Sequence, residues 1–358
     1  MKRLFALFVS IVALAACDRY FDISDQVGKS TVWMSFMPSN DYDTTFFCLQ
    51  ATTPLAGATT PVLTRDEQVE VLVNGTPLAM EKSGRSVPDK LQYYATTYAF
   101  KPGDKVEAVA TVPGTGSVSA SCEVPEPFPA YTWKATLARR SENEFILYTD
   151  IDYADSGEGE YLGAEVIEYC EIYGQMGMED PETGEILWGE TEAYTHTQAM
   201  YPSALSDSEG LSAGSEDPVS VYPRYYNYYN VLESSWNGKV QIWDDAPGAA
   251  PAGGRRQVTL ATHPNYRSGV MDYSSNGDDG EIFHHRVERR CKYQLVLYRF
   301  SESFYKYLKA QYNSTISDFS ELGLAPASFV YTNVKGGAGV CGSYTVSASD
   351  WLELPPVD

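Results

Sequence analysis

The chain has 358 residues, of which 43% are hydrophobic and 13% aromatic, and its formal net charge is −22. This length allows about two domains, and the 27 tyrosines among its aromatic residues favour strands over helices. A negative field of this size repels phosphate backbones and anionic lipid headgroups, which excludes nucleic-acid binding and a basic membrane-binding patch.

Residues 1–16 have the pattern of a bacterial lipoprotein signal peptide. Lys2 and Arg3 precede an uncharged run that is too short to span a bilayer, and Leu14-Ala-Ala-Cys17 resembles a lipobox. Cleavage would make Cys17 the lipid attachment site, and removing the positive charges of Lys2 and Arg3 changes the net charge from −22 to −24. The alternative is an ordinary signal peptide in which Cys17 is incidental.

Residues 17–30 are expected to form a lipidated tether, and residues 31–123 an immunoglobulin-like β-sandwich. Asn74-Gly75 lies between two apolar runs and predicts a tight hairpin, because both positions tolerate a positive φ. Further strands are expected over 93–100 and 105–112, with a turn between them and no helix nearby. Short strands at this spacing indicate antiparallel sheets.

Residues 124–130 form a proline-rich hinge and the best domain boundary, which leaves residues 131–358 as a larger antiparallel β domain. Strands are expected over 144–153, 164–173 and 294–300, and Glu182–Ile186 reads as a turn.

One helix is convincing. Ser301 suits its N-cap, Glu302 suits the positive end of its dipole, and Phe304, Leu308 and Tyr312 recur at helical spacing. The helix follows the strand over 294–300, so we expect it to pack on the second domain's sheet.

Two motifs match catalytic patterns only in their letters. Gly210–Gly214 spells G-x-S-x-G within a polar loop, without the strand and helix that a nucleophile elbow needs. Gly337–Gly342 spells G-x-G-x-x-G but runs into an expected strand, so its glycines indicate a tight turn or close backbone packing. The four histidines form no zinc-binding motif. We therefore expect no enzymatic activity.

A calcium site is one interpretation of an acidic stretch. Oxygen-bearing side chains alternate there as at the start of an EF-hand loop, although Phe283 replaces the glutamate at position twelve. The candidate ligands are Asp272, Ser274, Asn276 and Asp278. A solvated acidic loop is the alternative.

An aromatic segment is the candidate ligand-binding surface. Amphipathic rings bury a large area while keeping a polar tip, which suits a glycan or a peptide. The residues are Tyr222, Tyr225, Tyr226, Tyr228, Tyr229, Trp236 and Trp243. The alternative is that these rings are ordinary strand aromatics, divided between core and surface.

Five cysteines remain when Cys17 is lipidated, and no Cys-x-x-Cys occurs. Export permits disulfides, and Cys48 with Cys122 is a candidate pair within the first domain. The alternative is that the cysteines are small buried hydrophobes, which we favour for Cys170 because it shares a strand face with apolar residues. The sequence leaves the disulfide pairing open among Cys48, Cys122, Cys170, Cys291 and Cys341.

The chain resembles a Bacteroidota outer-membrane lipoprotein family, domain of unknown function 4249 (DUF4249). Its start, Cys17-Asp-Arg-Tyr-Phe-Asp22-Ile, is similar to the family's lipidated cysteine and short Asp-Ile. Leu297–Leu308 resembles the family's strand and helix with a Ser-x-x-x-Tyr-x-Tyr core, and Thr332–Gly342 resembles its terminal glycine-rich motif. Cys341 stands where that motif has phenylalanine.

The resemblance implies an outer-membrane lipoprotein, often encoded beside TonB-dependent transporters, and it supplies no catalytic residues. We therefore expect a non-enzymatic accessory to such a transporter, in the binding or uptake of a glycan or peptide nutrient. Asp18, Asp22 and Asp25 favour the cell surface over the periplasmic face. The alternatives are a structural or adhesive surface protein and, less favoured, a hydrolase with an unrecognised site.

Overall fold

The computed structural model describes residues 20–21, 31–41, 43–51, 66–84, 91–113, 115–141, 144–156, 159–180, 182–202, 219–221, 240–245, 254–276, 281–316 and 330–355. The predicted signal peptide over 1–16 and Cys17 lie outside these residues. The chain divides into two compact units, each described by itself. Unit 1 is made of residues 1–125 and 301–344, and unit 2 of residues 126–300 and 345–358.

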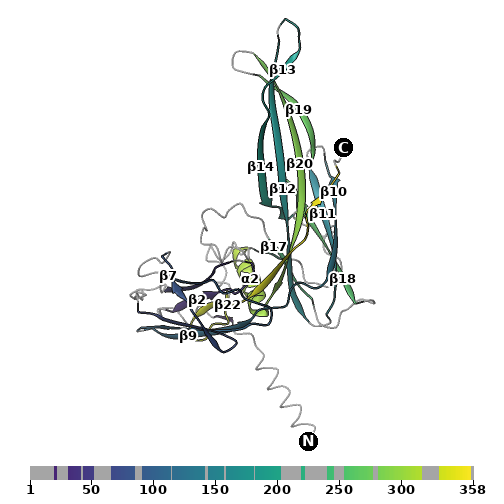
Figure 1. Cartoon of the computed structure of the whole chain (residues 1–358). Helices are drawn as coiled ribbons and strands as arrows, with labels where there is room; N and C mark the ends of the chain where they lie inside the picture. The colour runs from purple at the N-terminus through teal and green to yellow at the C-terminus, as the bar shows by residue number, and fades with distance from the viewer. Residues whose placement is uncertain are drawn as a thin grey trace. The chain divides into compact units, whose positions relative to one another are not determined.

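The described residues are mostly in β-strands, as predicted, and Figure 1 shows them by label. Unit 1 holds β1 (Tyr20–Phe21), β2 (Val32–Phe36), β3 (Thr45–Ala51), β4 (Gln68–Val73), β5 (Thr76–Leu78), β6 (Glu81–Lys82), β7 (Leu91–Thr96), β8 (Lys105–Val112), β9 (Gly116–Glu123), α2 (Glu302–Ile316), β21 (Val330–Tyr331) and β22 (Ala338–Cys341). Unit 2 holds β10 (Tyr131–Arg139), β11 (Phe145–Ala154), β12 (Glu160–Glu179), β13 (Ile186–Trp188), β14 (Glu192–Ala199), β15 (Tyr201–Pro202), β16 (Val219–Val221), β17 (Val240–Asp245), β18 (Arg255–His263), β19 (Gly269–Asn276), β20 (Ile282–Phe300) and β24 (Leu352–Glu353). Strand β23 (Tyr344–Ala348) runs across the boundary between the units.

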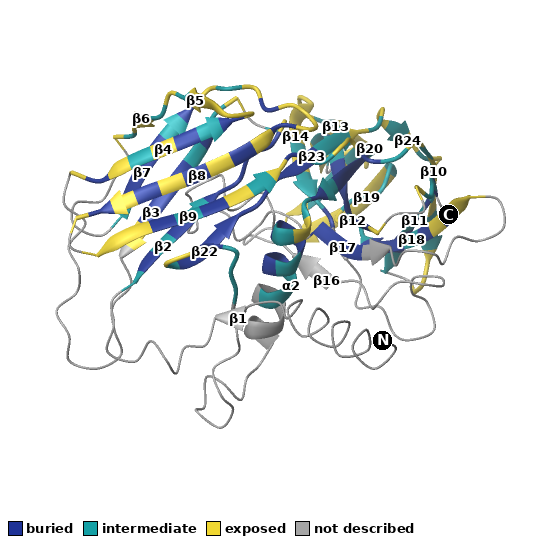
Figure 2. Cartoon of the chain, turned by 90° about the horizontal axis from the view of Figure 1, so that it is seen from below, coloured by how far each residue is buried: buried dark blue, intermediate teal, exposed yellow. Residues whose placement is uncertain are grey.

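Two sheets in unit 1 share one hydrophobic core. Their strand orders are β22-β2-β3-β7-β6 and β5-β4-β8-β9. Met34 and Phe47 from the first sheet and Val71 and Val106 from the second belong to the same buried cluster. Along β8 every second residue is buried, and Figure 2 shows this alternation as stripes. The period of two therefore directs one face of the strand into a sandwich core.

The predicted hairpin is confirmed at Asn74-Gly75. Strand β4 pairs antiparallel with β5, and the two turn residues have φ values of 53° and 76°. Positive φ at both central positions defines the type I′ turn, whose twist matches that of the flanking strands.

The predicted helix is confirmed, and it belongs to unit 1 and not to the C-terminal domain to which the sequence assigned it. The Ser301 hydroxyl accepts a hydrogen bond from the Phe304 backbone N–H at 3.4 Å, as an N-cap does. The same hydroxyl accepts the Ser343 N–H at 2.9 Å. Trp33 on β2 contacts Tyr307, with ring centroids 6.2 Å apart. The helix therefore covers the β2–β22 end of the sandwich.

Glycines let the second segment of unit 1 approach β2 closely. Strand β22 pairs in parallel with β2, so that Gly339 lies opposite Met34. Gly339 has a φ of +112°, and a Cβ atom there would collide with the Met34 carbonyl oxygen. A Cβ atom on Gly337 would collide with the Val32 carbonyl oxygen. The glycine-rich motif therefore serves close backbone packing, as the sequence indicates.

Unit 2 is built on one long antiparallel pair of strands. Strands β12 and β20 have 20 and 19 residues and pair in unbroken register from Tyr161↔Phe300 to Met178↔Phe283. They are the centre of a nine-stranded sheet, and a four-stranded sheet of order β10-β11-β18-β15 packs on one face. Leu162 and Leu295 from the first sheet meet Leu147 and Leu260 from the second in this core.

The division into units agrees with the predicted hinge but not with the predicted domain ends. The first boundary falls at Pro125–Glu126, inside the hinge over 124–130. Residues 301–344, which we assigned to the C-terminal domain over 131–358, belong to unit 1. The reason for this difference is that β22 pairs with β2, a long-range pairing that is present only in the folded structure. Within the expected tether, Tyr20–Phe21 forms β1 and pairs with β21.

Candidate functional site

One section of unit 2 extends beyond its own core. We call this section the arm; it consists of β13, β14 and β19 with the adjoining parts of β12 and β20 (Figure 1). The covering strands β10 and β11 have only 9 and 10 residues, about half the length of β12 and β20. The long pair therefore continues past the end of the sheet that covers it.

The face that is buried in the core stays mainly apolar along the arm, where Glu192 and Arg289 are its charged members. Even-numbered residues of β12 point into the core from Leu162 to Ile172, and Met176 and Met178 continue the same face. The strand register places residues of β13, β14 and β19 on the same face, beside these β12 side chains. We call the resulting set the apolar arm face; its exposed members are Met176, Met178, Leu187, Tyr194, Met271 and Tyr273.

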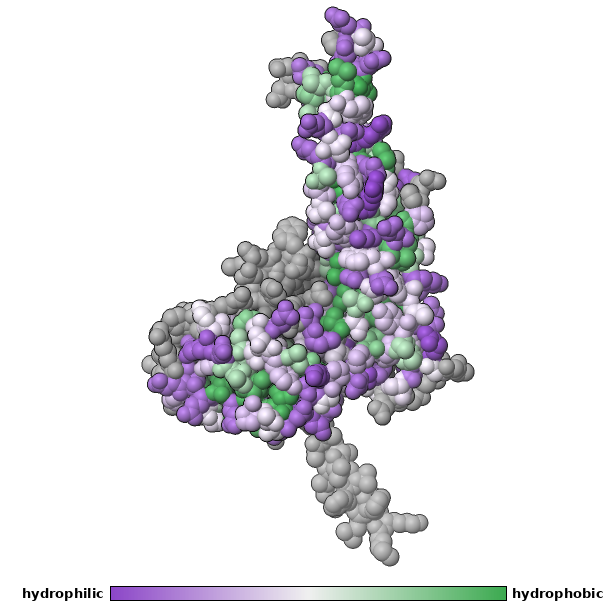
Figure 3. Space-filling model, viewed as in Figure 1, coloured by the Kyte–Doolittle hydropathy of each residue, from purple (hydrophilic) through white to green (hydrophobic). Residues whose placement is uncertain are grey.

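These side chains are open to solvent in the isolated chain. Leu187 is 62% exposed, Tyr194 58% and Met176 53%. Figure 3 shows hydrophobic residues at the surface near the end of the arm, around β13. The ring of His285 stacks on Tyr273 with centroids 4.7 Å apart and adds a further flat ring to this face. Contiguous exposed apolar side chains are typical of an interaction site.

The opposite face of the arm carries paired charged residues beside the exposed apolar side chains of Ile186, Val270 and Ile282. Arg286 donates two hydrogen bonds to the Asp272 carboxylate, each 3.0 Å long, and this contact lowers the pKa of Asp272. Arg290 donates to Glu288 at 2.8 Å, and its guanidinium lies 5.1 Å from the centre of the Tyr173 ring. This face has the character of a solvated sheet surface, so the two faces of the arm differ in chemistry.

A hollow of about 540 Å³ lies on the charged face where the arm meets the core. Tyr169 and Trp351 stand beside it, but Lys292 Nζ lies 4.5 Å and 5.2 Å from the centres of their rings. The ammonium group therefore occupies one face of each ring, on which a sugar would otherwise stack.

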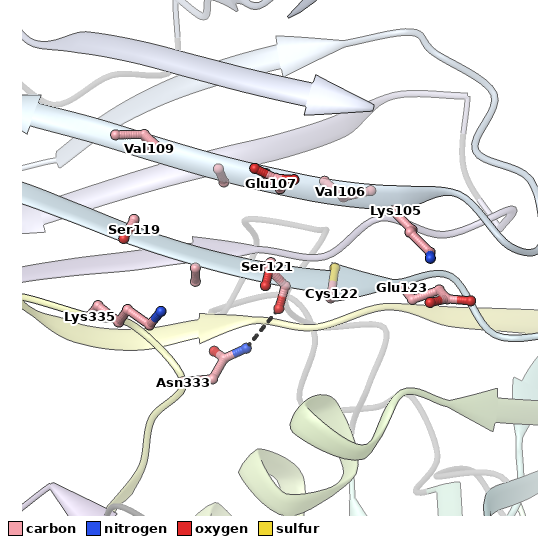
Figure 4. A pocket seen from close by; sticks show the side chains of 12 residues that line it. Lys105, Val106, Glu107, Val109, Ser119, Ser121, Cys122, Glu123, Asn333 and Lys335 are labelled. Carbon is pink, nitrogen blue, oxygen red and sulfur yellow. Dashed lines mark hydrogen bonds between the residues drawn. The ribbon is translucent and has the colours of Figure 1, made fainter. Parts of the chain in front are cut away.

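A second hollow, of about 700 Å³, lies on the outer face of β8 and β9 in unit 1 (Figure 4). Its charged lining is mixed, with Lys105 and Lys335 against Glu107 and Glu123. Asn333 Nδ2 donates to the Ser121 carbonyl oxygen at 3.3 Å. The amide at this hollow therefore holds two segments of the unit together.

Comparison with known families decides the membership of this chain. The model of a domain of unknown function, DUF4249, matches residues 21–350. The chain belongs to the DUF4249 family. The match covers both units and the returning segment that completes unit 1. No curated protein matches the chain.

Most of the binding surface predicted for this DUF4249 chain lies outside the described residues, as does Cys17, the predicted lipid attachment site. The aromatic residues concerned are Tyr222, Tyr225, Tyr226, Tyr228, Tyr229 and Trp236. Trp243 is described and is a correction: it is 1% exposed and belongs to the core of unit 2. Its indole N–H donates to the Tyr153 hydroxyl at 3.1 Å. A ring that is held in this way cannot form part of a ligand-binding surface.

The residues of the predicted calcium loop lie in a strand. Asp272, Ser274 and Asn276 belong to β19, and Asp278 lies outside the described residues. The Asp272 carboxylate is bound by Arg286, and the Ser274 hydroxyl lies 3.1 Å from His284 Nδ1. These three residues do not support the site that we predicted from them. Among the described residues, no group of three or more His, Cys, Asp or Glu side chains is arranged to hold a metal ion.

The apolar arm face was missed in the sequence. Gln175-Met-Gly-Met178 and Met271-Asp-Tyr273 do alternate, which is a strand signal. Alternation alone does not tell whether the apolar side is covered. The lengths of β10 and β11 relative to β12 and β20 decide that, and they belong to the tertiary structure. In the described part of the DUF4249 chain, no helix is long and apolar enough to cross a bilayer.

Proposed function

We propose that this chain is a non-enzymatic, lipid-anchored protein of the outer membrane that binds a partner protein through the apolar arm face. The partner is a TonB-dependent transporter, which the chain assists in the binding or uptake of a glycan or peptide nutrient. The anchor is the lipid on Cys17, and the cell surface is the favoured side. On this proposal unit 1 is an immunoglobulin-like sandwich, which its two facing sheets over one core support.

The observation that carries the proposal is the uncovered apolar face of the arm. Interface cores are rich in Met and Tyr and poor in charged residues, and this face holds three methionines and two tyrosines among its six exposed members. Methionine side chains adapt to the shape of a partner, because they are unbranched and polarizable. The charged groups on the opposite face are already paired with one another, so binding is assigned to the apolar side.

The test is a gentle-detergent pull-down of the tagged full-length protein from its own outer membrane, read by mass spectrometry. The variant Met176→Ser/Leu187→Ser removes two exposed apolar side chains from the apolar arm face. The matched control Val270→Ser/Ile282→Ser removes two from the other face, where Val270 is 61% and Ile282 46% exposed. We expect a stoichiometric transporter with the wild type and the control, and its loss with the arm-face variant.

Equal recovery of the transporter with both variants would contradict the assignment of the surface. Recovery of only the protein itself, or of fimbrial subunits, would contradict the transporter role. That result would favour the structural or adhesive alternative, in which the same apolar face joins copies or subunits.

A further inference from the structure

Two pairs of cysteine side chains come together in the structure, one in each unit. The sulfur atoms of Cys170 and Cys291 are 2.7 Å apart in unit 2, and those of Cys122 and Cys341 are 3.5 Å apart in unit 1. All four are thiols in the structure. The members of the pairs are 121 and 219 residues apart in sequence, so neither pair is a consequence of local chain geometry.

Cys170 and Cys291 occupy directly opposite positions on the antiparallel strands β12 and β20. The backbone N–H of Cys291 donates to the Ser268 hydroxyl at 2.9 Å, and its carbonyl oxygen accepts from that hydroxyl at 3.4 Å. Both backbone groups of Cys291 therefore point away from β12, and the two cysteines form a non-hydrogen-bonded pair. In such a pair the Cα atoms are about 4.5 Å apart, which is within the span of a disulfide.

Cys122 and Cys341 lie on β9 and β22, which come from the two separate segments of unit 1. Asn333 fixes the Cys341 backbone, because its Nδ2 donates to the Cys341 carbonyl oxygen at 2.7 Å and its Oδ1 accepts the Cys341 N–H at 2.9 Å. Cys341 is fully buried and Cys122 is half-buried beside the hollow in Figure 4. The sulfur of Cys341 is therefore held toward β9.

We propose that the exported chain carries two disulfides, Cys170–Cys291 and Cys122–Cys341. Each forms by exchange with an oxidant of the disulfide class. One cysteine thiolate attacks the oxidant's S–S bond and forms a mixed disulfide, and the second cysteine thiolate then displaces the remaining oxidant sulfur. The cysteines lose two electrons and two protons, and the oxidant leaves as two thiols.

Both bonds are structural and not regulatory. Burial raises the pKa of the Cys170 and Cys291 thiols, and the contact with Cys122 together with burial raises that of Cys341. Only the thiolate exchanges with a disulfide, so these buried sites react slowly once the chain has folded. One bond closes β12 to β20 near the base of the arm, and the other ties the returning segment to the sandwich. The inference depends on export but not on the identity of the partner.

The test is disulfide mapping of the full-length protein from its own membrane, with an alkylating agent added before the cells are broken. We expect peptides linked through Cys170–Cys291 and Cys122–Cys341, with Cys48 alkylated. Alkylation of both members of a pair, or a Cys48–Cys122 link, would overturn that pair.

The thermal stability of the protein gives a second, independent test of the two disulfides. We expect a reducing agent to lower the Tm of the wild type by on the order of 5 °C. It should leave the Tm of the Cys122→Ala/Cys170→Ala/Cys291→Ala/Cys341→Ala variant unchanged, while Cys48→Ala, the matched control, should respond as the wild type does. A wild-type Tm that stays unchanged after reduction in urea and refolding in the reducing agent would refute the proposal.

Discussion

At the scale of single residues, the most unusual group in the described part of the chain is the carboxyl of Glu168. It is fully buried on the core face of β12, opposite Tyr293. One oxygen accepts the Asn265 N–H at 3.0 Å and the Tyr266 N–H at 3.4 Å. Burial raises the pKa of Glu168 from 4.5 to about 7, although these two hydrogen bonds and the charge of Arg289 lower it. Desolvation therefore outweighs the favourable contacts.

This shift predicts a pH dependence of stability. The folded chain binds the Glu168 proton more tightly than the unfolded chain, so its contribution is fully present below pH 4.5 and is lost as the pH rises through about 7. The shift of about 2.5 pH units sets an upper limit of about 3 kcal/mol on this contribution. Urea unfolding of the wild type and Glu168→Gln at several pH values measures it. The free energy of unfolding of the wild type should fall relative to that of the variant between pH 4.5 and 7, and a constant difference would show that Glu168 stays ionised.

At the scale of elements, β12 shows how one strand serves two purposes. Its core-facing side is covered by the four-stranded sheet at Leu162 and open to solvent at Met178. The residues follow the same alternation throughout, because the pleat does not depend on what covers the sheet. Whether a side chain is buried depends on whether the neighbouring sheet covers it. Its contribution to the free energy of unfolding depends in turn on that burial.

Two truncations on this one face should therefore have very different effects. We expect Leu162→Ala to lower the free energy of unfolding by about 2–5 kcal/mol, because it leaves a cavity in a closed core. Met178→Ala should change it by less than about 0.5 kcal/mol, because this side chain is 45% exposed. Urea unfolding at low protein concentration makes the comparison. An equally large effect at Met178 would mean that the arm is covered in the isolated chain.

At the scale of the whole molecule, the unexpected feature is that unit 1 is discontinuous. Val334 and Cys341 from the second segment lie in the same core as Val32 and Met34 from the first. Strand β22 also supplies the hydrogen-bonding partner for one edge of β2. Without residues 301–344, the sandwich would expose both apolar surface and an open sheet edge.

The fragment of residues 18–125 should therefore lack a cooperative thermal transition, whereas the same fragment joined by a flexible linker to residues 301–344 should show one. The reason is that the missing segment completes the core and pairs with the edge strand. Thermal unfolding followed by circular dichroism distinguishes the fragment from the linked protein. A cooperative transition in the 18–125 fragment alone would contradict this expectation and support the continuous first domain that the sequence predicts.

The local features of this protein were readable in its sequence. The alternation over 105–112, the Asn74-Gly75 turn, the Ser301 cap and the terminal glycines all depend on residues a few positions apart, and the structure has each of them. The family was also readable, because the glycine-rich motif lies in one continuous stretch. These features depend on backbone preferences that neighbouring residues set by themselves.

The features that concern function were decided by the tertiary structure. The sequence suggested that Trp243 is part of a binding surface, but packing inside the core of unit 2 buries it. The apolar arm face needed the register of five strands and the shorter length of the covering sheet, and both cysteine pairs needed contacts across more than a hundred residues. Sequence alternation shows which side of a strand is apolar, but only the rest of the fold determines whether that side is covered, because burial depends on residues that are far apart in the chain.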